Sequence, residues 1–237
     1  SDMIASAKSD KTREKIEKEL GIRKADTNAQ VVDFADVVFL AVKPQFLEGV
    51  LDEIRDSVKA GQIFISIAPG KTLQWLGERL GENTKVIRTM PNTPAMVGEG
   101  MTALCVNELV TEEEIALAVK LCDTFGKTEV IPEHLMDAVV GVSGSSPAYV
   151  FMFLEAMADA AVADGMPRAQ AYKFAAQSVL GSAKLMLETG KHPGELKDMV
   201  CSPAGTTIQA VRVLEEKGFR SAVIEAQTEC VKKAKGM

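Results

Sequence analysis

Apolar and polar positions alternate with two different rhythms along the chain. In the first half, continuous apolar runs are separated by amphipathic segments. The runs VVFLAV (37–42) and IFISIA (63–68) are each followed directly by a proline-containing pair, Lys43-Pro44 and Pro69-Gly70. Such runs are typical of strands buried on both faces of a parallel sheet, and proline prevents further ladder pairing. We therefore predict two buried strands with ligand-facing turns behind them.

The rest of the first half continues this alternation. Apolar runs predict further strands at 3–7, 85–89, 101–106 and 128–131, and helical spacing predicts helices at 10–20, 46–58, 72–80 and 112–125. Gly21 is the expected C-cap of the first of these helices. Alternating strands and helices favour a mainly parallel sheet covered by helices, that is, a Rossmann-like α/β domain.

After Pro132 the pattern becomes helical throughout, with small-residue breaks at 144–147, 165–167, 190–194, 203–205 and 218. The sequence therefore predicts an α/β domain over 1–131 and an all-α helical domain over 132–237. Residues 149–163 and 175–187 are apolar on nearly all sides, and such helices need burial on more than one face. We predict a homodimer built on the helical domain; the alternative is one unusually large core.

Composition adds exclusions rather than a function. A net charge of -6 gives no electrostatic reason to expect nucleic acid or an anionic membrane as a partner. No uninterrupted apolar run reaches about 18 residues, and no secretory signal is visible. Four cysteines without a CxxC pair and two separated histidines predict no metal site, and the cysteines are interpreted as buried thiols of a reducing, cytoplasmic compartment.

The Gly-rich turn that opens a dinucleotide-binding fold is not found before the first strands. The run at 3–7 behaves as the second strand of such a fold, because a helix and another buried strand follow it. The α/β domain is thus predicted to be incomplete here. We expect its first strand, turn and helix to precede Ser1, and interpret their absence as an omission rather than a natural short form.

The tip of the 3–7 strand bears on the choice of cofactor. An acid at this position binds the ribose diol of NAD, whereas basic and hydroxyl groups accept the 2′-phosphate of NADP. Here the tip carries Ser6, Lys8 and Ser9, and Asp10 comes only after it. The residues favour NADP over NAD; the alternative is an ordinary polar turn.

Three loops carry unusual residue combinations. MPNTP (90–94) is stiffened by two prolines at the expected ligand edge. In GVSGSSPAY (141–149), Ser146 and Pro147 predict a helix start, with serine as the N-cap. CSPAGTTI (201–208) leads into a predicted helix at 209–216, where backbone N–H groups and the hydroxyls of Ser202, Thr206 and Thr207 could bind a carboxylate. Each loop also has a purely structural interpretation, as a rigid turn, tight helix packing or an N-cap without ligand.

Taken together, MPNTPA, VSGSSPAY, ADGMPR, HPGELKDMVCSPAGTT and LEEKGFR resemble the pyrroline-5-carboxylate reductases from about residue 3 to 231. The departures are the Gly-rich turn, Pro69 where alanine is frequent, and Ala204 where glycine is usual.

The resemblance implies NADPH-dependent reduction of L-Δ1-pyrroline-5-carboxylate to L-proline, with NADH as the alternative cofactor. It also implies a dimer through the helical domain, extended in some members to larger rings. It carries the catalytic role to Thr207. Substrate contacts are implied at Ser145, Ser202, Gly205, Thr206 and Thr207. Together with Lys8 from the strand tip, cofactor contacts are expected at Ser6, Asn28, Ala41, Lys43, Pro44, Ala68 and Asn92.

Two other functions were weighed. A β-hydroxyacid dehydrogenase would need a lysine early in the helical domain, and none occurs between Pro132 and Arg168. A non-catalytic dimeric scaffold would agree with the missing Gly-rich turn, but it has no use for the 202–207 constellation.

Overall fold

The computed structural model describes residues 2–236, which form two units by their contacts. Unit 1 holds the residues up to Gly144 and those from Val231 onward, and unit 2 holds Ser145–Cys230. The strands of unit 1 are β1 (Ile4–Ala5), β2 (Arg23–Lys24), β3 (Val37–Leu40), β4 (Ile63–Ser66), β5 (Lys85–Met90), β6 (Gly100–Val106) and β7 (Gly126–Val130). Its helices are α1 (Asp10–Leu20), α2 (Asn28–Phe34), α3 (Pro44–Ile54), α4 (Leu73–Leu80), α5 (Glu112–Cys122) and α6 (Met136–Val139).

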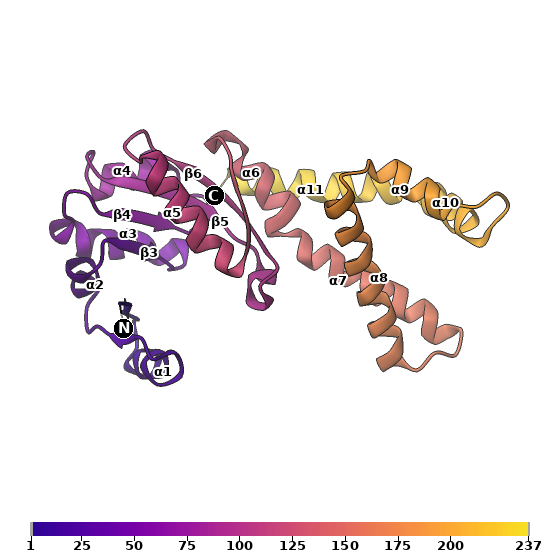
Figure 1. Cartoon of the computed structure of the whole chain (residues 1–237), viewed down its shortest axis with the longest axis horizontal. Coiled ribbons are helices and arrows are strands. Elements are labelled where there is room, and N and C mark those ends of the chain that lie inside the picture. The colour runs from indigo at the N-terminus through magenta and orange to yellow at the C-terminus, as the bar shows by residue number, and fades with distance from the viewer. Residues whose placement is uncertain (1, 237) are drawn as a thin grey trace. The chain divides into compact units, whose positions relative to one another are not determined.

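The main sheet of unit 1 has the order β3-β4-β5-β6-β7 (Figure 1). The pairs β3–β4 and β4–β5 are parallel, whereas β6 runs antiparallel to β5 and parallel to β7. The predicted strand at 3–7 is shorter than expected and pairs with β2 in a separate two-stranded parallel sheet. The mainly parallel α/β arrangement predicted from the sequence is confirmed.

The core of unit 1 explains why the apolar runs are continuous. Side chains alternate across a strand, so neighbouring residues of β4 face opposite sides of the sheet. Phe64 packs with Leu47, Leu51 and Leu76 of the helices on one side. Ile65 and Ile63 join a second cluster, with Ala118 of α5, on the other side. Both faces are covered, so both phases of the β4 sequence must be apolar.

Local capping signals act as predicted at α1. The Ser9 hydroxyl accepts a hydrogen bond from the Thr12 amide at the N-terminus, and Gly21 ends the helix with φ of 64°. An αL residue at this position costs glycine no steric strain, which is why glycine ends helices so often. The Asp10–Leu20 helix and its Gly21 cap are therefore confirmed.

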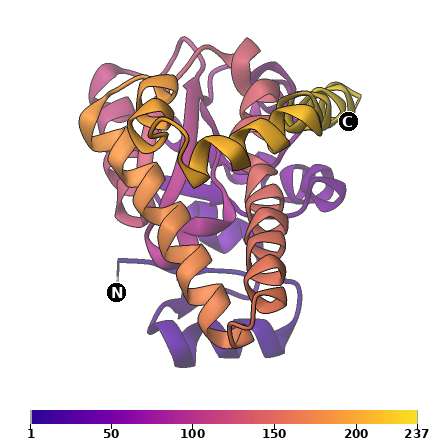
Figure 2. The ribbon, with the colours of Figure 1, turned by 90° about the vertical axis from the view of Figure 1, so that its right-hand side faces the viewer.

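Unit 2 consists of helices only, as predicted. They are α7 (Ser146–Ala163), α8 (Arg168–Thr189), α9 (Pro193–Val200), α10 (Thr206–Glu216) and most of α11 (Phe219–Lys235), whose last residues belong to unit 1. α7 and α8 form an antiparallel pair joined by a turn at Gly165 (Figure 2). The predicted breaks at 165–167, 190–194, 203–205 and 218 coincide with the ends of these helices.

The predicted break at 144–147 is confirmed, although it is a single residue long. A π-helical turn over Val140–Gly144 follows α6 directly, Ser145 is a bend, and α7 begins at Ser146. The N-cap of α7 is Ser145, not Ser146, and Pro147 occupies the second helical position. Proline is tolerated at this point because the first-turn N–H groups have no intrahelical acceptor.

Few side chains of unit 2 are buried. Within residues 145–230 only Ala158, Ala171 and Ala175 are buried, and large apolar side chains such as Phe151 and Phe174 stand 60% and 68% exposed. By length and composition alone, the helical stretch Glu133–Ala163 could also cross a membrane, although little of it is buried. The sequence did not indicate this stretch, because polar residues interrupt its apolar positions before a run of about 18 is reached. An apolar surface this extensive needs a covering partner in water.

Candidate functional site

Three candidate cofactor residues lie at one edge of the main sheet. β3, β4 and β5 are adjacent and parallel, so their carboxyl ends meet at the same edge. Ala41 follows β3, Ala68 follows β4 and Asn92 follows β5. In open α/β sheets, ligands bind outside this edge. The structure thus brings together residues that the sequence places 27 and 24 positions apart, that is, at 41, 68 and 92.

Lys43 and Pro44 shape the turn behind Ala41. Lys43 is the N-cap of α3 without a side-chain cap, and Pro44 is the first helical residue. Proline at this position begins the helix with a preset φ and lacks only an N–H that would have no intrahelical partner. The exposed Lys43 side chain therefore remains available at the carboxyl edge.

Ser6 and Asn28 form a second group. The Ser6 hydroxyl donates to Asn28 Oδ1 over 2.6 Å. The Glu53 carboxylate then holds Asn28 from the other side, accepting its backbone N–H at 3.0 Å and its Nδ2 at 2.6 Å. Sequence reasoning missed Glu53, because no local signal connects residues 25 positions apart.

The turn after β1 carries Lys8 and Ser9. The Lys8 ammonium lies 5.2 Å from the centre of the Phe46 ring. Arg13, which sequence reasoning also missed, donates to the Ala7 carbonyl at 2.7 Å and pairs with Asp10. The i, i+3 spacing of Asp10 and Arg13 could have predicted this ion pair, because residues three apart are neighbours on a helix. The turn is thus tied to the first turn of α1.

Asn92, a predicted cofactor contact, also makes hydrogen bonds that hold the protein together locally. Its Nδ2 donates to the Ser143 carbonyl at 3.2 Å, and its Oδ1 accepts the Met101 amide at 2.9 Å. These bonds tie the loop after β5 to β6 and to the π-helical turn. According to the described residues, the second N–H of the amide and one lone pair of Oδ1 are then left for a cofactor.

A buried ion pair supports the loop that follows Ala68. Glu133 Oε1 accepts both Arg88 Nη1, at 3.0 Å, and the Leu73 amide at the start of α4, at 2.7 Å. Arg88 is only 6% exposed, so its charge needs this partner. The pair fixes the beginning of α4 and with it the loop from Ala68 to Thr72.

Burial and the Arg88–Glu133 pair also affect the pKa of the neighbouring Cys105 thiol. Cys105 lies opposite Arg88 on β6. Burial, together with the negative charge of Glu133, raises the pKa of Cys105 to about 12, although Arg88 acts in the opposite direction. This cysteine is a neutral core side chain. Of the four thiols, Cys105 and Cys122 are buried as expected, whereas Cys201 and Cys230 are only half-buried.

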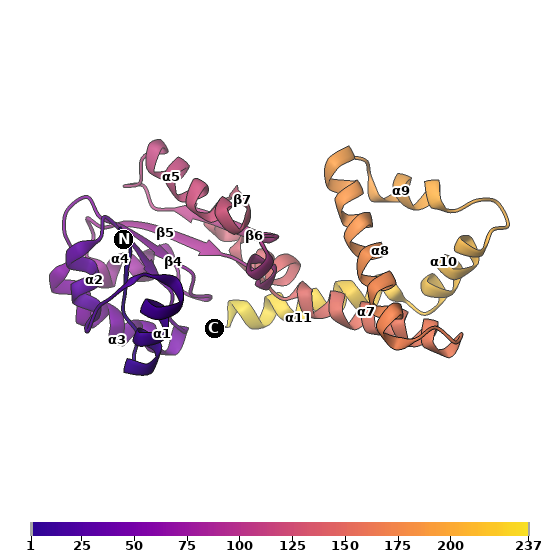
Figure 3. The ribbon, with the colours of Figure 1, turned by 60° about the horizontal axis from the view of Figure 1, so that its bottom comes forward.

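The candidate substrate residues of unit 2 lie at the start of α10. That helix begins at Thr206, three residues earlier than predicted, so Thr206 and Thr207 are its first two residues. Figure 3 shows the connection from α9 to α10 at the edge of unit 2. The first N–H groups of a helix have no intrahelical acceptor and favour an anion. Because of the earlier start, the predicted N–H donors include the amides of Thr206 and Thr207 themselves.

Gly205, a predicted substrate contact, also shapes the turn. Its amide donates to the Ser202 carbonyl at 3.0 Å. A Cβ at this position would collide with the Ser202 hydroxyl oxygen and lie 3.1 Å from the Ser202 carbonyl oxygen, so a larger residue would force the Ser202 side chain to move. Ala204 beside it has φ of 59°, which is unfavourable for alanine. This backbone explains why glycine is usual at that position in the family that the sequence resembles.

Ser145 lies apart from this turn in the contacts that unit 2 shows. Its hydroxyl accepts a hydrogen bond from the Cys230 thiol over 3.1 Å and caps no amide of α7. Tyr149, one turn further on, has a raised pKa because of desolvation first and of its hydrogen bond with Cys230 second. The structure places Ser145 beside these two side chains, which no sequence pattern connected.

Comparison with known proteins agrees with both halves of the chain. Residues 133–237 match the family model described as pyrroline-5-carboxylate reductase dimerisation, and residues 1–70 match the one described as NADP oxidoreductase, coenzyme F420-dependent. The pyrroline-5-carboxylate reductase of Escherichia coli K12 is 60% identical over 216 residues, which cover 91% of this chain and 80% of that protein.

Solved structures give the same result. The enzyme of Streptococcus pyogenes superposes with a TM-score of 0.90 at 36% identity, covering 99% of this chain and 89% of that one. The Plasmodium falciparum pyrroline carboxylate reductase, whose structure holds NADP, superposes with a TM-score of 0.88 at 28% identity over 98% of this chain and 86% of that one. With its Rossmann-like sheet, its helical domain and these relatives, the chain belongs to the pyrroline-5-carboxylate reductase family of oxidoreductases.

Proposed function

We propose that this protein reduces L-Δ1-pyrroline-5-carboxylate to L-proline with NADPH. The observation that carries the proposal is the start of α10, where Thr206 and Thr207 are the first helical residues and no side chain caps the helix N-terminus. This arrangement suits a small carboxylate, and it stands in a chain 60% identical to a pyrroline-5-carboxylate reductase. We also propose that the division of labour follows the sequence domains, with cofactor on 1–131 and substrate and dimer contacts on 132–237.

The residues of unit 1 fit the cofactor. Ala41 and Ala68 are small, so a flat ligand can approach the carboxyl edge of β3 and β4 closely. Lys43, Pro44 and Asn92 border this edge, and the Ser6–Asn28 pair with Lys8 supplies a hydroxyl, an amide and a cation for a 2′-phosphate. This donor set favours NADPH over NADH. When bound, NADPH supplies the hydride for the reaction.

The substrate half needs little acid–base chemistry. A protonated imine is already an electrophile, so the main tasks are orientation and exclusion of water. The amides of Thr206 and Thr207, with the Ser202 and Thr206 hydroxyls, hold the carboxylate, and Gly205 allows the turn to close. The Thr207 hydroxyl forms a hydrogen bond with the ring nitrogen. In the protonated imine this nitrogen bears an N–H, and the same proton remains on it in the product amine. Ser145, at the start of α7, is proposed as a further substrate contact separate from this turn.

The exposed apolar helices support an oligomer. α7 and α8 leave Phe151, Phe174 and their neighbours in contact with solvent, and three alanines are too small a core for five helices. A second copy covering these faces would form a homodimer, consistent with the dimerisation model matched over 133–237. Larger rings and a cytoplasmic location, in keeping with its thiols, belong to the same proposal.

A comparison of two threonine variants tests the assignment. Thr207→Ala should lower kcat for NADPH oxidation that depends on pyrroline-5-carboxylate about 100-fold, within the range of a lost transition-state hydrogen bond. NADPH binding should remain nearly unchanged. Thr228→Ala removes a hydroxyl that donates to the Ile224 carbonyl of its own helix, and serves as the matched control.

Two results would contradict this scheme. If Thr207→Ala lost NADPH affinity alone, Thr207 would belong to the cofactor site instead. If folded, dimeric wild-type protein showed no substrate-dependent oxidation, the non-catalytic scaffold would be the better interpretation.

A further inference from the structure

Phe46 is a large apolar side chain that the core of unit 1 does not bury. It lies in the first turn of α3, directly behind Lys43 and Pro44 at the carboxyl end of β3. Its neighbour Leu47 belongs to the buried side of α3, whereas Phe46 is 52% exposed. A single exposed apolar residue is common on a protein surface. The surroundings of this one, however, point to a ligand.

The Phe46 ring lies beside the turn that follows β1. The Lys8 ammonium is 5.2 Å from the centre of the ring, within the range of a cation–π contact. Lys8 is exposed, and within the described part of the chain it makes no ion pair. Its charge is therefore available to an anion, which under the proposed function is the 2′-phosphate of NADPH. The cation for this phosphate and the phenyl ring are thus neighbours.

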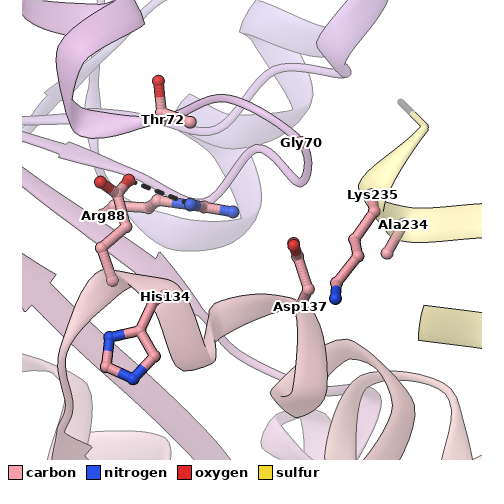
Figure 4. Close-up of a pocket in the computed structure, with 8 residues that line it drawn as sticks. Gly70, Thr72, Arg88, His134, Asp137, Ala234 and Lys235 are labelled. Carbon is pink, nitrogen blue, oxygen red and sulfur yellow. Dashed lines mark hydrogen bonds and ion pairs between the residues drawn. The ribbon is translucent and has the colours of Figure 1, made fainter. Parts of the chain in front are cut away.

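The pocket shown in Figure 4 has no comparable charge to offer that phosphate. Two bases line it, Arg88 and Lys235, together with two acids, Glu133 and Asp137. Glu133 is paired with Arg88, and the Asp137 carboxylate lies between the Arg88 guanidinium and the Lys235 ammonium (Figure 4). The acids of this pocket therefore balance its bases, and the turn after β1 is the better phosphate site.

We propose that Phe46 is the platform on which the adenine ring of the cofactor packs. In NADPH, the adenine and the 2′-phosphate are bonded to neighbouring carbons of one ribose. A phosphate held by Lys8 therefore brings the adenine within reach of the phenyl ring beside Lys8. Stacking on an aromatic side chain holds a base by its π-face and needs no hydrogen-bond partner. Because it depends on the phosphate contact of Lys8, this role of Phe46 rests on the proposed function.

A platform for the base can be distinguished from a mere support for Lys8. A platform contributes to the binding of NADPH and of NADH alike, because both cofactors contain adenine. A residue that only positions Lys8 contributes to NADPH alone, because NADH has no 2′-phosphate. Phe46 should show the first pattern, and Lys8 itself should show the second.

Titration of the full chain with each reduced cofactor, followed by nicotinamide fluorescence, measures these contributions. Phe46→Ala should raise the Kd of both NADPH and NADH by about 5- to 100-fold, the range of a lost base–aromatic stack. Phe46→Tyr keeps the aromatic ring and should bind as wild type does, whereas Phe46→Leu should recover only part of the affinity. Lys8→Met should weaken NADPH binding and leave NADH binding nearly unchanged.

Phe34 provides the matched control. It is 43% exposed, and the Arg23 guanidinium lies 4.1 Å from the centre of its ring. However, Phe34 ends α2 ahead of β3, so it lies at the amino end of that strand rather than at the ligand edge. Phe34→Ala should therefore leave the Kd of both cofactors unchanged. An equal loss in Phe34→Ala and Phe46→Ala would reflect a general effect of removing a surface ring and would overturn the platform.

The pattern across the two cofactors decides between the remaining interpretations. A loss in Phe46→Ala that is confined to NADPH would overturn the platform and make Phe46 a support for Lys8. Unchanged binding of both cofactors would overturn it as well, and Phe46 would be an ordinary exposed residue. Circular dichroism of each variant checks that a loss of binding does not come from a loss of fold.

The proposed function is tested separately, because these titrations contain no pyrroline-5-carboxylate. A chain without substrate-dependent NADPH oxidation, but with Phe46-dependent binding of both cofactors, would sink the reductase and leave the platform standing. An active reductase whose Phe46→Ala variant binds both cofactors as tightly as wild type would overturn the platform alone.

Discussion

The Arg88–Glu133 pair makes a sharp prediction about stability. Glu133→Ala would leave a guanidinium that is 6% exposed without its counter-ion and remove the acceptor of the Leu73 amide. Removing one partner of a buried ion pair typically costs about 3–5 kcal/mol. The Glu133 side chain is 31% exposed, so water can partly replace it. We therefore expect a loss at the lower end, about 3 kcal/mol.

Substitutions at the same positions separate charge from shape. Glu133→Gln keeps an oxygen acceptor but removes the counter-charge of Arg88, so it should lose less than Glu133→Ala, about 1.5–2 kcal/mol. The double variant Arg88→Met with Glu133→Leu removes both charges and should be less destabilised than the sum of its single variants. Glu108→Ala changes an exposed glutamate and should stay within about 0.5 kcal/mol of wild type.

Urea unfolding followed by circular dichroism and fluorescence measures these differences. All variants must be compared at one protein concentration, because dimerisation contributes to the apparent stability. If Glu133→Ala and Glu108→Ala shifted the free energy of unfolding equally, the buried pair would have no special role. The support that we ascribe to the Ala68–Thr72 loop would then fall as well.

Three further predictions concern other parts of the chain. Ala204→Gly should raise the free energy of unfolding by about 0.5–1 kcal/mol, because φ of 59° strains alanine and the gain exceeds the entropy cost of glycine; a lower urea midpoint would refute the strain. Native protein treated with iodoacetamide at pH 8 should show Cys201 modified and Cys105 intact by mass spectrometry. With a pKa of about 12, only about one Cys105 in ten thousand is a thiolate at that pH, and rapid alkylation would contradict its burial. Glu114 accepts from Lys85 at 2.6 Å and from the Thr111 amide at 3.0 Å, and chiefly the Lys85 hydrogen bond lowers its pKa. A lowered folded-state pKa stabilises above the unfolded value of about 4.3 and is lost as pH falls through the folded value. Glu114→Gln should therefore be slightly less stable than wild type at pH 7, and the gap should close in acid; a gap that stayed constant from pH 7 to pH 3 would exclude the ion pair as its cause.

Much of the fold follows from the sequence, because burial leaves a local periodic pattern. The run at 63–68 had to be apolar in both phases, since helices cover both faces of β4. The run at 37–42 is buried mainly on one face, because Phe39 of β3 is 44% exposed. Gly21 ends α1 as predicted, because this signal depends only on the left-handed backbone conformation of one residue. Ala41, Ala68 and Asn92 could be grouped in advance, because parallel strands place their carboxyl ends at one edge.

What the sequence alone could not determine depends on side chains that meet across the tertiary structure. Glu53 reaches Asn28 across 25 positions, and Glu133 reaches the Leu73 amide across 60. The start of α10 and the π-helical turn before α7 also involve hydrogen bonds that the sequence does not reveal. The Gly205 amide donates to the Ser202 carbonyl before α10, and Asn92 donates to the Ser143 carbonyl in the π-helical turn. The sequence by itself therefore determined the layers, the helical domain and the motif residues. Only the tertiary structure decided which polar groups are already satisfied by the protein and which remain free for a ligand, because a hydrogen bond forms only when folding brings its two partners within reach.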